Sequence, residues 1–264
     1  MSLHIDHQGD GEPLVVLPAF GLDHGAMAAA VEPAFAADST WRRWYVDLPG
    51  TGRSPSGEPS SDAVLDELVA TIEDRLGTDR FALLGWSYGA YLGAGLIRRR
   101  SERILGMMMV CAGFKIRPAD RDLTGTLRSR PEPDWLSAVP PYLHEHFEEA
   151  IGHQTVAAAR RTSAAILANG PSDDAYLDAL RGNGFALSDE EEPTTLDAPA
   201  CLVTGRRDRI AGYRDAMLGA PYLPQADYVT LADAGHYLPF EQPEVFAMLV
   251  RTWLSRCRPS DQPR

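Results

Sequence analysis

FALLGWSYG, residues 81–89, is the stretch of the sequence that decides the fold. Its apolar first part predicts a buried strand, and the residues after it predict the start of a helix. Between them lies Gly85-Trp86-Ser87-Tyr88-Gly89, a G-x-S-x-G pattern. A serine on so tight a turn has a strained backbone, and bulky neighbours two residues away would collide. Because glycine removes those collisions, the pattern favours a nucleophilic Ser87 over an incidental serine in a Gly-rich turn.

Short apolar runs alternate with helical patterns along the rest of the chain. We predict strands at 14–18, 44–47, 81–86, 105–111 and 200–205, with a weaker one at 228–231. Most of these runs do not alternate in polarity, which is typical of parallel strands covered on both faces. We predict helices at 62–76, 88–99 and 244–256. The alternation indicates an α/β fold with a doubly wound, mostly parallel sheet and right-handed crossovers.

The segment 114–196 breaks this rhythm because it contains no convincing strand. It carries helical patterns at 142–151, 154–168 and 173–187, separated by Pro-rich connections. We therefore predict a core formed by residues 1–113 and 197–258, a helical cap at 114–196 and a flexible tail at 259–264. Such an insertion could form a lid over a pocket.

Composition narrows the possible partners and the compartment. The 264 residues suffice for one large α/β domain. A formal net charge of −12 argues against nucleic acid or an anionic membrane surface as a partner. No apolar run of transmembrane length occurs, and the first residues lack the regions of a secretory signal peptide. The odd number of cysteines, with Cys111 and Cys201 in apolar runs, favours buried thiols. We expect a cytoplasmic protein.

A serine hydroxyl is a weak nucleophile until a base takes its proton and a third group orients that base. His236 fits the base, because it follows the weak strand 228–231 and lies at the sheet edge expected for Ser87. Asp208 follows the strand 200–205 at the same edge, where its carboxylate can fix the imidazole tautomer. The alternative for Asp208 is a turn aspartate paired with neighbouring arginines. We predict Ser87, Asp208 and His236 as a catalytic triad.

The oxyanion of an attacked carbonyl also needs hydrogen-bond donors. The Tyr88 backbone N–H lies at a predicted helix N-terminus, where it and the helix dipole face the developing charge.

Together these motifs resemble the α/β-hydrolase superfamily, in its capped, serine-nucleophile form, over nearly the whole chain. Residues 47–54, DLPGTGRS, look like the D-x-P-G-x-G-x-S turn of capped members, which we interpret as structural. Residues 17–21, LPAFG, resemble the loop that supplies the second oxyanion-hole amide. By that resemblance the donor is the Phe20 N–H, although Pro18-Ala19 stands where His-Gly is usual.

Neither a metal nor a cofactor is expected. His144, Glu145, His146 and Glu148 suggest a metal pattern, but His144 and His146 would point to different helix faces. No G-x-G-x-x-G fingerprint or phosphate-binding loop occurs. Asp23-His24 fits either a pocket lining or a structural hydrogen bond. Several aromatic side chains are candidates for the pocket border: Trp86, Tyr88, Trp135, Tyr142 and Tyr237.

The resulting hypothesis is a serine hydrolase that cleaves a small-molecule carboxylic ester, lactone or thioester through an acyl-enzyme on Ser87. We expect an apolar substrate. Cleavage of a C–C bond or an aminopeptidase activity would use the same residues. Two rivals from other classes are a non-hydrolytic ligand-binding protein and a lyase or cyclase on the same scaffold. The oligomeric state is not readable from the sequence.

Overall fold

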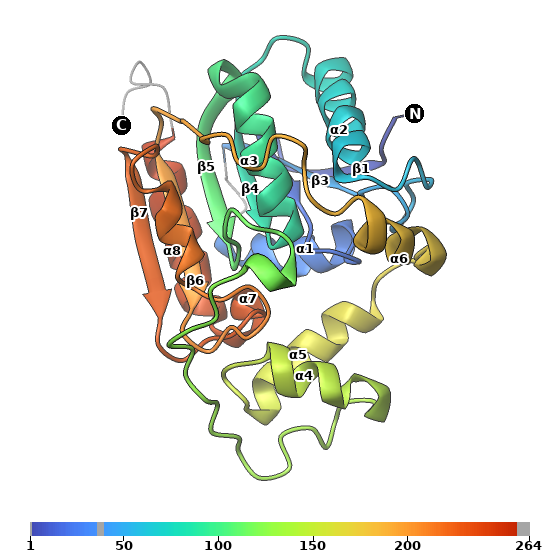
Figure 1. Cartoon of the computed structure of the whole chain (residues 1–264), viewed down its shortest axis with the longest axis vertical. Coiled ribbons are helices and arrows are strands. Elements are labelled where there is room, and N and C mark those ends of the chain that lie inside the picture. Colours follow the sequence, from blue (N-terminus) through green and yellow to red (C-terminus); the bar gives the residue numbers. More distant parts are fainter. Residues whose placement is uncertain (1, 36–39, 258–264) are drawn as a thin grey trace.

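The computed structural model describes residues 2–35 and 40–257 (Figure 1). Within these ranges one sheet has the strand order β1-β3-β2-β4-β5-β6-β7. Neighbouring strands pair in parallel except at one edge, where β1 is antiparallel to β3. The strands are β1 (Ile5–Gln8), β2 (Glu12–Leu17), β3 (Trp41–Val46), β4 (Phe81–Trp86), β5 (Ile104–Val110), β6 (Ala200–Gly205) and β7 (Ala226–Leu231). The predicted α/β fold with a mostly parallel sheet is confirmed.

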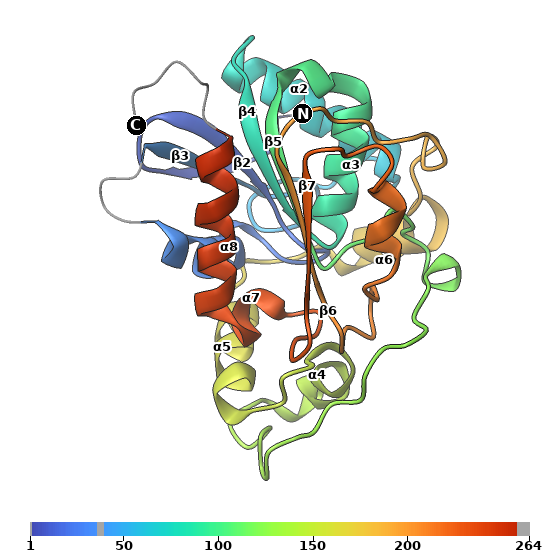
Figure 2. The same cartoon turned by 90° about the vertical axis from the view of Figure 1, so that its left-hand side faces the viewer.

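Helices cover both faces of the sheet. Figure 2 shows the sheet nearly edge-on, with α8 (Pro243–Arg256) on one side and α3 (Tyr88–Arg100) on the other. The short helix α1 (His24–Val31) packs on the same face as α8, whereas α2 (Ser61–Leu76) lies with α3. Successive residues of a strand point to opposite faces, so Leu14 enters one core cluster and Val15 the other. This double burial explains the unbroken apolar runs.

Two elements lack the signals used for prediction. β1 has the sequence IDHQ, which is polar because the strand lies at the sheet edge and is only half-buried. α1 has the sequence HGAMAAAV, in which small apolar residues show no contrast between faces. Asp23 caps α1 by accepting hydrogen bonds from the Gly25 and Ala26 backbone N–H groups at 2.9 and 3.2 Å.

The chain between β5 and β6 is helical, as expected. It contains α4 (His144–Ala150), α5 (Val156–Leu167) and α6 (Asp174–Asn183), and α4 and α5 lie beyond the carboxyl ends of the strands (Figure 1). The described residues of 114–196 form no strand apart from one isolated bridge between Ser172 and Thr51. Their division from the core as a cap stays a prediction, and the tail at 259–264 lies outside the described residues.

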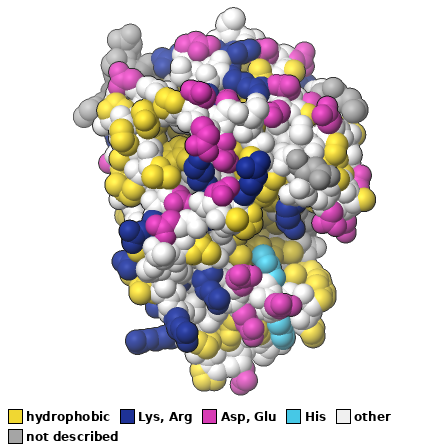
Figure 3. Space-filling view, in the orientation of Figure 1, with side chains coloured by type: hydrophobic (Ala, Val, Ile, Leu, Met, Phe, Trp, Pro, Cys, Tyr) yellow, Lys and Arg dark blue, Asp and Glu magenta, His cyan; other side chains and the backbone are white. Residues whose placement is uncertain are grey.

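The arginines at the end of α3 are neutralised by acidic side chains. Arg98 lies 2.6 Å from Asp189, and Arg100 lies 2.8 Å from Glu73. Acidic and basic side chains are likewise interspersed over the face shown in Figure 3. All three cysteines are free and buried. No helix in the described part of the chain is long and apolar enough to cross a membrane.

Candidate active site

Ser87 occupies a sharp turn between β4 and α3 with φ +52° and ψ −115°. Backbone crowding around this turn explains both glycines of the motif. A Cβ on Gly85 would lie 2.5 Å from the Ala90 backbone, and one on Gly89 would lie 2.4 Å from the Leu17 carbonyl oxygen. Since real Cβ contacts are not this short, any larger residue would displace the turn or the strand beside it. The turn therefore has the strand–turn–helix geometry that the sequence predicts.

Three loops at the carboxyl ends of β4, β6 and β7 bring the predicted triad residues together. The Ser87 Oγ lies 3.0 Å from His236 Nε2, and His236 Nδ1 lies 2.9 Å from Asp208 Oδ2. Asp208 is fully buried, and its Oδ1 accepts hydrogen bonds from the Ile210 and Ala211 backbone N–H groups, both at 2.9 Å. A carboxylate held in this way can fix the tautomer of the imidazole and stabilise its protonated form.

The loop that carries His236 is tied to the neighbouring elements. The His236 backbone N–H donates to the Ala150 carbonyl oxygen at 2.7 Å, and Trp86 Nε1 donates to the His236 carbonyl oxygen at 3.0 Å. Trp86 belongs to β4 and Ala150 to α4. These contacts limit the positions that the imidazole can take relative to Ser87.

Glu241 is a buried carboxylate that the sequence analysis did not single out. Its Oε2 accepts backbone N–H groups from Gly235 at 2.8 Å, Gly152 at 2.9 Å and His153 at 2.6 Å. Burial raises the pKa of Glu241 to about 7, although the three N–H donors oppose this shift. The side chain thus joins the His236 loop to the segment after α4. It stands in the short helix α7 (Leu238–Glu241), where nothing in the sequence distinguishes it from a solvent-exposed glutamate.

A cavity of about 490 Å³ opens over Ser87 and His236. Of the aromatic candidates, Trp86, Tyr88 and Tyr237 line this cavity. Trp135 instead lines a second hollow, and Tyr142 is 73% exposed. The cavity is within the usual size range of small-molecule sites.

The two predicted oxyanion donors lie in residues that also line this cavity, Phe20 and Tyr88. Their rings contact edge to face, with centroids 5.4 Å apart. Tyr88 is the first residue of α3, so its N–H has no partner within the helix. The Tyr88 hydroxyl lies 2.8 Å from Ser61 Oγ, and this contact anchors the ring.

His146 also faces the cavity, where its Nε2 lies 2.9 Å from the Tyr237 hydroxyl. Burial lowers the pKa of His146, and the charge of His236 lowers it further. His144 does not join it, because His144 Nε2 bonds to the Val139 carbonyl oxygen at 2.9 Å. The sequence showed His146 only as part of a doubtful metal pattern. No signal in the sequence indicates that it faces the triad.

Asp23 and His24 do not line the cavity over Ser87 and instead have structural partners. The fully buried Asp47 accepts the His24 backbone N–H at 2.8 Å and the Arg53 backbone N–H at 2.9 Å, and it contacts His24 Nδ1 at 2.8 Å. His4, His24 and Asp47 bring possible ligand atoms within 4.8 Å of one another. Because the Asp47 oxygens already accept these hydrogen bonds, we interpret the cluster as a structural feature that stabilises the 47–54 turn.

Several curated relatives match nearly the whole chain. A pimeloyl-[acyl-carrier protein] methyl ester esterase of Nitrosomonas europaea is 30% identical over 254 residues, which cover 93% of this chain and 96% of the relative. The protein of the same name from Aeromonas salmonicida is 27% identical, and the match covers 95% of this chain and 98% of the relative.

Solved structures have the same fold. An alpha/beta superfamily hydrolase from Oenococcus oeni PSU-1 superposes with a TM-score of 0.87 at 25% identity, covering 97% of this chain and 99% of that one. A thermophilic esterase from Thermogutta terrifontis has the same fold, with a TM-score of 0.71 at 24% identity, covering 97% of this chain and 94% of that one. The family model described as "Alpha/beta hydrolase family" matches residues 14–249. The chain is therefore an esterase-like hydrolase and belongs to the alpha/beta hydrolase family.

Proposed function

We propose that the protein is a serine esterase that hydrolyses small-molecule carboxylic esters through an acyl-enzyme on Ser87. The observation that carries this proposal is the continuous hydrogen-bonded series from Ser87 Oγ through His236 to the buried Asp208. Ser87 and His236 line a cavity that is large enough for a small ester. The names of the two curated relatives favour a carboxylic ester over a lactone, a C–C bond or a peptide bond.

In the first half-reaction, Ser87 Oγ attacks the ester carbonyl carbon while its proton passes to His236 Nε2. The carbonyl oxygen becomes an oxyanion, which accepts hydrogen bonds from the Phe20 and Tyr88 backbone N–H groups. The C–O bond to the alcohol then breaks, and the leaving oxygen takes the proton from His236. Ser87 remains joined to the acyl group by a new ester bond.

In the second half-reaction, a water molecule gives a proton to His236 Nε2 and attacks the acyl carbon. The tetrahedral intermediate collapses by breaking the bond to Ser87, whose oxygen recovers the proton from His236. The acid leaves, and the protein returns to its starting state. Asp208 stays ionised throughout and stabilises each transient imidazolium.

The test combines active-site labelling with turnover. A fluorophosphonate should label the parent protein once, at Ser87, and p-nitrophenyl esters should be hydrolysed. In Ser87→Ala the label should be absent and kcat should fall by at least about 1,000-fold, with an unchanged circular-dichroism spectrum. Ser255→Ala, which removes an exposed hydroxyl on α8, is the matched control and should behave as the parent.

Turnover by Ser87→Ala at the parent rate would exclude the acyl-enzyme. Absence of both labelling and turnover in the parent would favour a ligand-binding protein. Labelling without turnover on a broad ester panel would instead favour a specialised enzyme such as a lyase or cyclase.

A further inference from the structure

Three arginines line the cavity over Ser87: Arg121, Arg181 and Arg209. Of the side chains that line it in the described part of the chain, Glu149 is the one carboxylate. The cavity wall is therefore cationic, whereas the chain as a whole has a formal net charge of −12. The overall composition does not predict a positively charged cavity on so acidic a protein, so the cause of this charge must lie in the residues around the cavity.

Unlike eight other arginines, these three guanidinium groups have no ion-pair partner among the described residues. No carboxylate oxygen of a described residue lies within 4.0 Å of the guanidinium nitrogens of Arg121, Arg181 or Arg209, which is the distance limit for an ion pair. Other arginines do have such partners, as Arg43 has Glu32 at 2.7 Å and Arg98 has Asp189 at 2.6 Å. The positive charge at the cavity is thus not cancelled by direct contacts with the protein.

Arg121 and Arg181 are held by contacts that leave their charge intact. Arg121 donates to two backbone carbonyl oxygens, that of Ile210 at 2.8 Å and that of Ile116. The Arg181 guanidinium, which comes from α6, stacks over the Phe20 ring with its carbon 4.5 Å from the ring centroid. Burial lowers the pKa of Arg121, the charges of Asp208 and Asp215 oppose this shift, and the charge of Arg181 adds a smaller lowering effect.

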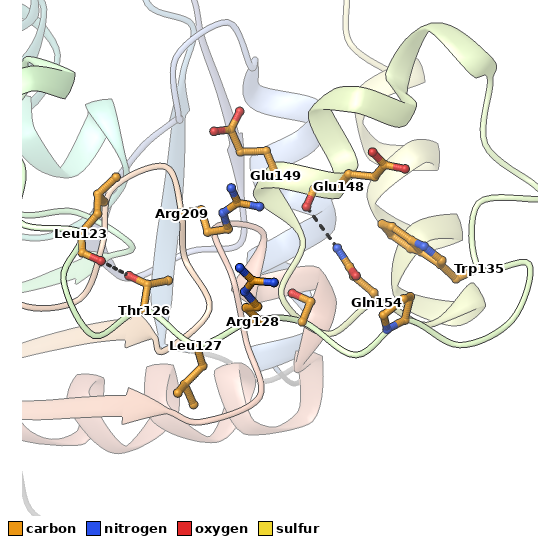
Figure 4. Close-up of a pocket in the computed structure, with 11 residues that line it drawn as sticks. Leu123, Thr126, Leu127, Arg128, Trp135, Glu148, Glu149, Gln154 and Arg209 are labelled. Atoms are coloured by element: carbon orange, nitrogen blue, oxygen red, sulfur yellow. Dashed lines mark hydrogen bonds between the residues drawn. The ribbon is translucent and has the colours of Figure 1, made fainter.

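Arg209 lies directly after Asp208 in the chain and borders two hollows. The second hollow, of about 810 Å³, shares Leu123, Glu149 and Arg209 with the cavity over Ser87. Figure 4 shows Arg209 among its lining side chains, between the segment that carries Leu123 and the helix that carries Glu149. The side chain is exposed and keeps its donors available to a ligand.

Cations that are brought together without counter-ions repel one another, and partial burial adds a desolvation cost. An anion bound among them relieves both costs, and guanidinium groups bind carboxylates through paired, charge-assisted hydrogen bonds. Apolar side chains line the same cavity, namely Leu22, Ile116 and Phe185. The cavity therefore suits a molecule that combines a short apolar chain with an acidic group.

We propose that the enzyme selects esters whose acid portion carries a second, free carboxylate, and that Arg121, Arg181 and Arg209 bind this carboxylate while the ester carbonyl lies at Ser87. The inference rests on the proposed esterase activity and adds its substrate class: monoesters of short dicarboxylic acids. It adds an acidic group to the apolar substrate that we expect from the sequence.

The experiment compares matched methyl esters. Acid release from monomethyl succinate, glutarate and adipate is measured in a pH-stat beside methyl butyrate, valerate and hexanoate. For the best chain length, kcat/KM should be at least about tenfold higher for the monoester that carries the carboxylate than for its neutral counterpart. Because exposed charges are screened, this preference should shrink as salt is raised from about 0.01 to 1 M.

Variants then test the arginines. Arg181→Gln and Arg209→Gln should each lower kcat/KM for the charged ester by about tenfold and change it less than about twofold for the neutral ester. Arg181→Lys should restore part of the preference because it keeps the charge. Arg160→Gln, which removes an exposed arginine of α5 outside this cavity, is the control and should leave both substrates unaffected.

Inhibition distinguishes the possible anions. Glutarate should compete with the charged ester, and inorganic phosphate should compete more weakly. Competition by phosphate alone would overturn the assignment to a carboxylate. Equal turnover of charged and neutral esters, or equal losses on both in the arginine variants, would overturn the selectivity but leave the esterase proposal standing. Failure to hydrolyse any ester would overturn both.

Discussion

The His236 Nδ1 lies 2.9 Å from the Asp208 Oδ2, although 28 residues separate them in the chain. Asp208 is fully buried, and its other oxygen accepts two backbone N–H groups. The carboxylate therefore cannot turn away to solvent, and the imidazole beside it keeps Nε2 directed at Ser87. The Asp208 carboxylate should therefore hold His236 in the tautomer that carries its proton on Nδ1.

Asp208→Asn should lower kcat on p-nitrophenyl esters by about 10,000-fold, because an amide in place of the carboxylate favours the wrong imidazole tautomer. The fold should persist, since the asparagine oxygen can still accept the N–H groups of Ile210 and Ala211. Steady-state kinetics and thermal unfolding give the two readouts. Asp178→Asn, at an exposed position on α6, controls for loss of charge. A loss of less than tenfold in kcat would contradict a role for Asp208 in orienting the base.

Gly89→Ala should destabilise the protein by about 2 kcal/mol or more, because the new methyl group would meet the Leu17 carbonyl oxygen. The matched control is Gly182→Ala in α6, where a Cβ would find no atom within 4 Å. That replacement should stabilise the protein by about 0.5–1 kcal/mol, since alanine favours a helix over glycine. Urea unfolding measures the change in the free energy of unfolding for both variants. Similar changes for the two substitutions would show that the turn is not crowded at Gly89.

Glu241 predicts a pH dependence of stability. Burial raises its pKa from 4.5 to about 7, so the folded state binds a proton more tightly than the unfolded state does. Stability from this group is therefore fully present below pH 4.5 and is lost as the pH rises to about 7. The loss is on the order of 3 kcal/mol.

Glu241→Gln should remove this part of the pH dependence, because the amide does not titrate. The measurement is the free energy of unfolding in urea at several pH values, for the parent and the variant. Glu244→Gln, at an exposed position on α8, should keep the parent profile. Parallel profiles for the parent and Glu241→Gln would show that Glu241 does not titrate in this range.

The sequence was most informative where burial is complete. The predicted bounds of β4 and β6 agree with the structure, since both strands are buried along their whole length and end at Gly or a turn. The prediction missed β1 and α1, because a half-buried edge strand and a short Ala-rich helix show neither clear periodicity nor clear polarity. A local sequence pattern indicates which residues are buried, and these two elements show little contrast between buried and exposed positions.

The sequence by itself determined the fold class and named the three side chains of the candidate triad, because the tight turn at Ser87 demands glycines and parallel strands share one carboxyl edge. Only the tertiary structure decided which residues surround that triad. Arg121, Arg181 and Arg209 come from separate segments and carry no common motif. Their convergence depends on how the chain between β5 and β6 packs over the sheet edge. Long-range packing of this kind leaves no periodic trace in the sequence.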